Sequence, residues 1–244
     1  MMTSEDIVRR YEAYKVGLQG SLSSALYSYH PLSALQSSNL KTSIDYALVT
    51  TSEDIKALIK QAANDSLSES VTELVSISNE DIRKLLSNDS LTALYSETVE
   101  EATHLILSRM RQDAFEVTRL HHEFRLKVNL RAYDGTDKIE HVIVGERERL
   151  LLGFSPKQTD SMGRRYDSSN YVERIINYMV ASVHRQAMFF ALLSLGHEKA
   201  VVSGGSYDGK VILLDNFFEL EPKIFHYGSK ARLKPDVTGE LNGM

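Results

Sequence analysis

The stretch YVERIINYMVASVHRQAMFFALLSLG, residues 171–196, decides how the second half of this chain folds. Its apolar residues recur at steps of three and four, which predicts an amphipathic helix over residues 170–195. Ser168 or Ser169 is expected to cap the helix start, and Gly196 is expected to end it. The stripe predicted to face the core consists of Val172, Ile175, Ile176, Met179, Val183, Ala187 and Phe190.

The segment after this helix, KAVVSGGSYDGKVILLDNFF, contains a near match to the phosphate-binding pattern G-x-x-x-x-G-K-[ST] at residues 204–211. A phosphate-binding loop needs a hydroxyl after its lysine and a helix behind it. Here Val211 replaces the hydroxyl, and the following run is apolar and β-branched, as in a strand. The sequence therefore predicts a hairpin with its turn at Asp208-Gly209, and no bound nucleotide.

Upstream, FRLKVNLRA (124–132) alternates strictly between apolar and polar residues, and IEHVIV (139–144) follows an Asp134-Gly135 pair. This alternation is typical of a half-buried strand. We therefore expect a β-hairpin over residues 124–144, followed by a polar loop over 154–169.

The first half of the chain reads as a series of helices, including an expected long helix from about Glu97 to Leu120. The serine-rich residues 19–43, interrupted by Pro31, are expected to form short helical turns and loops. The predicted fold class is α+β: a helical N-terminal half followed by a small antiparallel β-sheet packed on a long helix. The predicted domains are a helical domain, 1–120, and an α+β domain, 121–244. The second contains the hairpin 124–144, the long helix 170–195 and terminal strands within 199–236.

The amino-acid composition excludes several kinds of functional site. The chain has 42% hydrophobic and 25% charged residues with a formal net charge of −5, which is ordinary for a globular protein. It has no cysteine, which excludes disulfides, thiolate metal sites and cysteine nucleophiles. No membrane span is expected. The histidines have no metal-ligand spacing, and no catalytic motif is present. We therefore expect no catalytic residues, no cofactor and no metal.

Basic residues offer one candidate binding surface. On a strand, Arg125, Lys127 and Arg131 share one face at a spacing close to that of successive phosphates, which predicts weak, sequence-independent contact with DNA. The alternative is an ordinary solvated strand face.

The tail, residues 222–236, offers a second candidate surface because it mixes apolar, aromatic and basic side chains. We interpret it as an anchor for another chain, with aromatic contacts buried and cations at the rim. The alternative is that the tail forms the last strand of the protein's own sheet. The candidate docking residues are Phe225, Tyr227, Lys230, Arg232 and Leu233.

The order of these C-terminal segments resembles the minor head proteins of tailed bacteriophages, the family of phage Mu protein F. In that family a long helix precedes a strand, a D-G turn with a hydrophobic strand, and a closing segment of the form P..HP.CRC.L.P. Residues of this chain stand in a similar order, with Ser229 and Ala231 where the family's cysteines are expected: Pro222, His226, Ser229, Ala231, Arg232, Leu233 and Pro235.

The resemblance implies a non-enzymatic structural protein of a phage head or neck, attached near the portal vertex. It implies a role in head assembly or in genome packaging or ejection, and a location in the virion after assembly in the host cytoplasm. The expected partners are portal, capsid or neck proteins, with several copies in one assembly and weak contact with genomic DNA. Two alternatives stay open: a nuclease or transferase with a scattered site, and a cytosolic protein-binding regulator.

Overall fold

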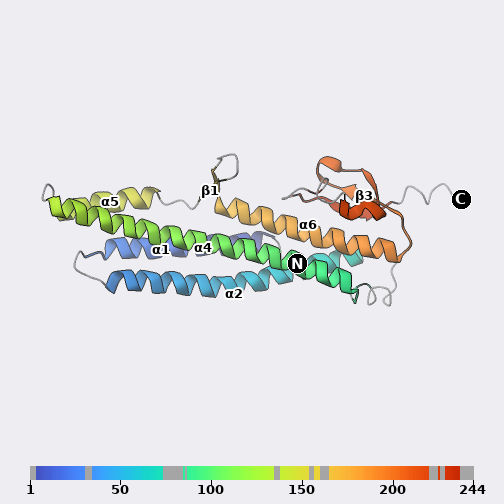
Figure 1. Cartoon of the computed structure of the whole chain (residues 1–244), viewed down its shortest axis with the longest axis horizontal. Helices are drawn as coiled ribbons and strands as arrows, with labels where there is room; N and C mark the ends of the chain where they lie inside the picture. The colour runs from blue at the N-terminus through green and yellow to red at the C-terminus, as the bar shows by residue number, and fades with distance from the viewer. Residues whose placement is uncertain are drawn as a thin grey trace. The chain divides into compact units, whose positions relative to one another are not determined.

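The computed structural model describes residues 4–30, 35–73, 85, 87–134, 138–153, 157–159, 165–219, 225 and 229–236. Its secondary structure is mostly helical, with a small antiparallel sheet near the C-terminus, so the predicted fold class is confirmed (Figure 1). The helices are α1 (Ser4–Tyr27), α2 (Leu35–Thr72), α4 (Asp89–Asp134), α5 (Ile139–Gly153) and α6 (Ser168–Ser194). The strands are β1 (Lys157–Thr159), β2 (Arg165–Asp167), β3 (Lys199–Ser203), β4 (Val211–Leu213) and β5 (Arg232–Pro235).

The chain divides into two compact units. Unit 1 contains Met1–Asp6, Ala57–Leu105 and Glu173–Met244, and unit 2 contains Ile7–Lys56 and Ile106–Val172. Helices α1, α2, α4 and α6 contribute residues to both units. The expected boundary at residue 120 lies inside α4, so the units do not follow the two halves of the sequence.

The predicted hairpin over 124–144 is wrong, because its first strand is the last part of α4 and its second is the start of α5. Phe124 and Val128 are fully buried, whereas Leu126 and Leu130 are more than half exposed. Phe124 and Val128 continue the buried face of α4 that includes Val117, on which buried residues recur at steps of three and four. The alternating pattern arose because α4 carries apolar residues on two opposite faces. Gly135, the expected turn glycine, lies outside the described residues.

The long helix predicted for 170–195 is confirmed as α6, with one difference at its start. The backbone N–H of Ser169 donates to Asp167 Oδ1 at 2.7 Å, so Asp167 caps the helix instead of Ser168 or Ser169. At the other end Gly196 has a φ of +78°, and the N–H of His197 donates to the carbonyl of Leu192 at 3.0 Å. This is the Schellman geometry that glycine favours.

The C-terminal sheet has the strand order β4-β3-β5 and is antiparallel throughout. Residues 204–211 connect β3 to β4, which confirms the predicted hairpin. The connection contains a 3-10 turn, Gly205–Tyr207, and Asp208 Oδ1 accepts a hydrogen bond from the N–H of Gly204 at 2.6 Å. Gly209 has a φ of +77°, the left-handed backbone expected there.

The sheet packs against the C-terminal half of α6 (Figure 1). Side chains of α6 and of all three strands join one buried cluster, to which Val71 of α2 and Leu91 of α4 also belong. A separate pair, β1 and β2, lies within the predicted loop 154–169, where Gln158 pairs with Tyr166. The members of the buried cluster from α6 and the sheet are Ala187, Met188, Phe189, Ala191, Leu192, Ala200, Val202, Ile212 and Leu233.

The helical assignment of residues 124–134 predicts unequal effects for two neighbouring substitutions. Phe124→Ala should lower the free energy of unfolding by about 3–5 kcal/mol, because it empties a fully buried site. Leu126→Ala should change it by about 0.5 kcal/mol or less, because Leu126 is exposed. Chemical denaturation of both variants measures this. Similar losses from both would contradict the helix, since a strand places the two residues on one face.

The backbone at Gly209 predicts a local strain effect. Nothing lies within 4 Å of a Cβ built at Gly209, so Gly209→Val should destabilise through its positive φ alone, by about 1–3 kcal/mol. Gly145→Ala in α5 is the matched control, because that site is equally open and helical, and it should stabilise by about 0.5–1 kcal/mol. An unchanged melting temperature for Gly209→Val would refute the turn geometry.

Candidate functional site

The most unusual local environment in unit 1 is the second half of α6, where residues 181–189 are all buried. A helix buried on every side is normally apolar, because a buried polar group without a hydrogen bond costs free energy. This segment nevertheless contains a polar run, which we define as Ser182, His184, Arg185 and Gln186. Its partners in the rest of unit 1 identify the candidate site.

Arg185 is fully buried and connects α6 to the chain leading into β5. Its Nη1 donates to the carbonyl oxygen of Ala231 at 2.9 Å. Its guanidinium carbon lies 4.3 Å from the centre of the Phe225 ring and 5.6 Å from that of Tyr178. A planar guanidinium stacks on aromatic rings more favourably than an ammonium group does, so lysine would be a poor substitute here.

His184 joins α6 to a charged network at the end of α2. Its Nε2 lies 3.3 Å from Oε2 of Glu73. Arg232 of β5 lies beside the same carboxylate, with its Nη1 2.7 Å from Glu69 Oε1 and 3.8 Å from Glu73 Oε1. The network therefore connects three elements that are far apart in the sequence.

Electrostatics favour a neutral His184 ring. Burial lowers the pKa of His184 below its ordinary value, and the positive charge of Arg232 lowers it further. Glu73 and Glu69 act in the opposite direction without reversing the shift. A neutral ring can donate from Nε2 to Glu73, while its Nδ1 is buried without a hydrogen-bond partner among the described residues.

Two further hydrogen bonds connect α6 to α4 and α2. Gln186 Nε2 donates to Thr98 Oγ1 at 3.0 Å, and Ser66 Oγ donates to the carbonyl of Val180 at 2.7 Å. The polar run thus connects α6 to three other elements by hydrogen bonds. Sequence reasoning missed it, although one signal was available: HRQ interrupts an otherwise apolar helical segment.

Unit 2 has a buried charged cluster of its own. Asp113 is fully buried and accepts hydrogen bonds from Tyr11 Oη and Arg109 Nη2. Tyr14 Oη donates to the carbonyl of Met110 at 2.9 Å. Burial raises the pKa of both tyrosines well above the ordinary value, and the charge of Asp113 raises it further. Both phenols therefore stay protonated and act as hydrogen-bond donors.

The predicted DNA-contact residues do not share a face. Because the segment is helical, Arg125 lies about 160° around α4 from Lys127. Lys127 is paired with Glu123 at 2.7 Å, and Arg131 lies 3.7 Å from Glu146. The phosphate-spacing argument, which required a strand, is therefore wrong.

The predicted docking residues have three different environments. Phe225 and Leu233 are buried in the core of unit 1, and Arg232 is held by the carboxylates of α2. Lys230 is exposed, and Tyr227 lies outside the described residues. Residues 232–235 form β5 and pair with β3, so the tail contributes the last strand of the protein's own sheet.

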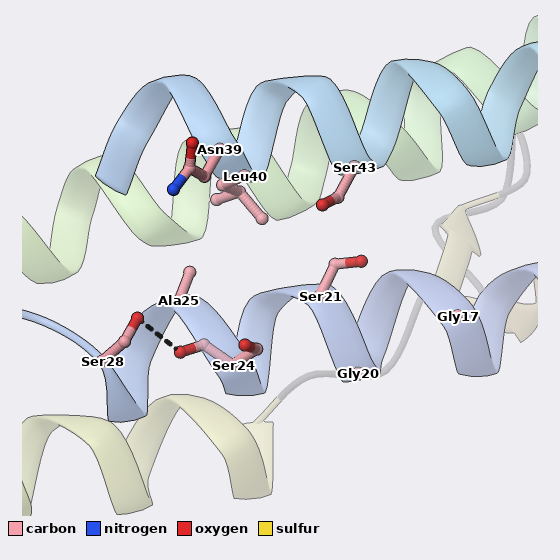
Figure 2. Close-up of a pocket in the computed structure, with 9 residues that line it drawn as sticks. All are labelled: Gly17, Gly20, Ser21, Ser24, Ala25, Ser28, Asn39, Leu40 and Ser43. Atoms are coloured by element: carbon pink, nitrogen blue, oxygen red, sulfur yellow. Dashed lines mark hydrogen bonds between the residues drawn. The ribbon is translucent and has the colours of Figure 1, made fainter. Parts of the chain in front are cut away.

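A groove of about 460 Å³ lies between α1 and α2 in unit 2 (Figure 2). Short side chains leave this space between the two helices, and Ser21 and Ser43 face it from opposite sides. Ser28 Oγ donates to the carbonyl of Ser24 at 2.8 Å. The lining residues in the described part of the chain carry no titratable group: they are Gly17, Gly20, Ser21, Ser24, Ala25, Ser28, Asn39, Leu40 and Ser43.

The described residues contain neither a metal-binding cluster nor a membrane-spanning helix. No three His, Asp or Glu side chains gather there in a way that would hold a metal ion. Among the helices that the structure describes, none combines the length and apolar character that crossing a bilayer requires.

The lowered pKa of His184 predicts a pH-dependent stability. The unfolded chain binds a proton near pH 6.5 and the folded chain does so only at lower pH, so the free energy of unfolding should fall as pH drops from about 8 to about 5.5. His184→Gln should flatten this dependence, whereas His122→Gln, at an exposed position of α4, should not. Urea unfolding across this range is the measurement, and an identical slope in wild type and His184→Gln would contradict the assignment.

No protein-family model matches the chain, and neither the curated proteins nor the solved structures contain a match. The likeness of the C-terminal segment to phage minor head proteins therefore stays a hypothesis.

Proposed function

We propose that the protein is a non-enzymatic structural component of a tailed-phage head or neck, attached near the portal vertex. It would assist head assembly or the packaging or ejection of the genome. One observation carries the proposal: the segments behind the family resemblance, from α6 through β3 and β4 to β5, fold together around one buried cluster in unit 1.

The closing segment supports the proposal despite the missing cysteines. Ser229 and Ala231 stand at the family's cysteine positions, and both are buried. Ser229 Oγ accepts a hydrogen bond from the N–H of Ala231 at 3.2 Å. The carbonyl of Ala231 accepts the bond from Arg185. A local bond and a buried arginine thus hold this segment on α6.

The polar side chains of both units also fit a structural role. The groups most suited to proton transfer are His184 with Glu73 in unit 1 and Tyr11 with Asp113 in unit 2. They bond α6 to the end of α2 and α1 to α4. These bonds join residues about a hundred positions apart in the sequence. Such connections resist local opening, which suits a component of a particle that bears the pressure of packed DNA.

Two observations test the proposal. Genes for a portal and a terminase are expected beside the gene for this protein, and a neighbourhood that lacks both would overturn the phage assignment. Mass spectrometry of purified particles should then detect the chain at a few copies per portal. Particles that contain the portal but not this chain would overturn the structural role.

A further inference from the structure

Strand β4 forms one edge of the sheet in unit 1, because the strand order is β4-β3-β5. Just after β4, the N–H of Leu214 donates to the carbonyl of Glu198 at 2.9 Å. Just before β4, the carbonyl of Lys210 accepts a hydrogen bond from the N–H of Val202 at 2.9 Å. These two bonds fix which backbone groups of β4 face β3, since successive residues of an antiparallel strand direct these groups to alternate sides.

The alternation leaves the two neighbours of Ile212 facing outward. Ile212 lies between the two flanking bonds and faces β3, opposite Ala200. The N–H and C=O of Val211 and the N–H of Leu213 therefore point away from β3, and none of the three is hydrogen-bonded to another described residue. The C=O of Leu213 belongs to the 3-10 turn Leu214–Asn216 that follows. We call the three outward groups the open edge.

The other edge of the sheet is less suited to a further strand. By the same alternation, the residues of β5 that face outward are Leu233 and Pro235. A proline has no N–H to donate, and proteins use prolines in this position to prevent the addition of strands. Strand β4 contains neither a proline nor a charged residue. The open edge is therefore the side on which the sheet can be extended.

The side chains beside the open edge are apolar. Val211 and Leu213 lie on the face of the sheet opposite the buried cluster, and each is 48% exposed. Val201 of β3 pairs with Val211 and continues this surface, and it is half-buried. A strand added beside β4 would place every second side chain against these residues. Branched or aromatic apolar side chains are the best cross-strand neighbours for them.

The backbone groups select an extended polypeptide as the occupant. A helix keeps its backbone groups bonded within itself, and only an extended chain presents donors and acceptors in alternation along one side. The charges of residues 198–215 sum to −1, which disfavours the phosphates of a nucleic acid. The charged residues are two lysines, Lys199 and Lys210, against three carboxylates, Glu198, Asp208 and Asp215.

A second copy of β4 fits the open edge less well than an extended segment of a different protein. The strand has three residues, and it lies between the 3-10 turns Gly205–Tyr207 and Leu214–Asn216. Two copies could therefore share bonds only over this short length. An extended segment can continue past both ends of β4 and add contacts there.

We propose that the open edge binds an extended, uncharged segment of another protein as a fourth strand of the sheet. The segment forms backbone hydrogen bonds with Val211 and Leu213 and carries branched apolar residues at alternate positions. This docking goes beyond the proposed function and does not depend on it, because the open edge is a property of unit 1 alone.

Amide hydrogen exchange, measured by NMR on the full chain, tests whether the edge is open. The amides of Val211 and Leu213 should exchange about tenfold faster or more than the amide of Ile212, which is bonded to β3. Equal protection of the three amides in the free chain would overturn the proposal, because the edge would then be covered already.

The probe for docking is a fluorescent peptide of alternating threonine and valine with a lysine at each end, titrated by anisotropy. Its binding should slow amide exchange at Val211 and Leu213. The control peptide is methylated on every backbone nitrogen, which removes its donors and obstructs strand pairing, so it should not bind. Equal binding of the methylated peptide, or no binding of the first peptide at millimolar concentration, would overturn the proposal.

Two substitutions at one position make the matched test on the protein side. Val211→Pro removes an outward N–H but no bond between β3 and β4, so peptide binding should weaken by about tenfold or more. Val211→Thr keeps the N–H and should bind like the wild type, and circular dichroism checks that both variants fold. Equal affinity of the two variants would contradict the role of this N–H. The methylated peptide tests the same bonds on an unaltered chain.

Sedimentation equilibrium distinguishes the two polypeptide occupants. The wild-type chain and Val211→Pro should show the same molecular mass. A wild-type dimer that is lost in Val211→Pro would overturn the choice of occupant, because a second copy would then fill the open edge. Absence of the protein from phage particles would instead count only against the proposed function.

Discussion

The burial of polar side chains along the second half of α6 is the constraint on which unit 1 depends. Nine consecutive residues, 181–189, are buried, and four of them are polar. Each polar group needs a partner. The partners come from the end of α2, from α4 and from the segment before β5, and Gln186 also donates to Ser182 within α6. The sheet, the end of α2 and the start of α4 are therefore positioned by hydrogen bonds as well as by apolar packing. Replacing one partner would leave a buried group unsatisfied, so the network is more sensitive to substitution than an apolar contact of the same area.

Unit 2 also buries a charged side chain, but its partners are arranged differently from those in unit 1. Its buried charge, Asp113, is paired with Arg109 one turn away on α4 and with Tyr11 of α1. In unit 1 the charges come from different helices and a strand, whereas here most of the neutralisation is local. The high pKa of Tyr11 keeps its hydroxyl proton available as a donor over the whole physiological range. Tyr11 therefore stays a hydrogen-bond donor to Asp113 across that range.

The parts of the fold that the sequence predicts are those where one pattern has one explanation. Helix α6 has a single apolar stripe and a glycine stop, and the 204–211 connection has a glycine in a left-handed position. The strand predicted for residues 124–132 is wrong because this part of α4 carries apolar residues on two opposite faces, with Phe124 buried and Leu126 exposed. Read along the sequence, the two faces together give the same apolar–polar alternation as a strand. Burial in the folded protein distinguishes a strand from a helix with two apolar faces, whereas the periodicity of the sequence does not.

The candidate site was less accessible to prediction than the fold. The polar run of α6 becomes unusual only when the helix is seen to be buried all round, which depends on where the sheet packs. The predicted docking residues show the same difficulty. From the sequence, Phe225 and Leu233 fit an anchor for another chain as well as they fit the core, and only the pairing of β5 with β3 distinguishes the two roles. The hydrophobic content of a segment does not indicate whether it is buried in the protein's own core or against another chain.

The closing segment before β5 also has a chemical consequence. It is held on α6 by the Ser229 hydroxyl, the Ala231 backbone and the Arg185 guanidinium, and none of these groups gains or loses electrons under biological conditions. A thiol pair at the same positions would change its bonding with the redox potential of its surroundings. The attachment of this strand is thus the same in a reducing cell interior and in an oxidising medium outside it.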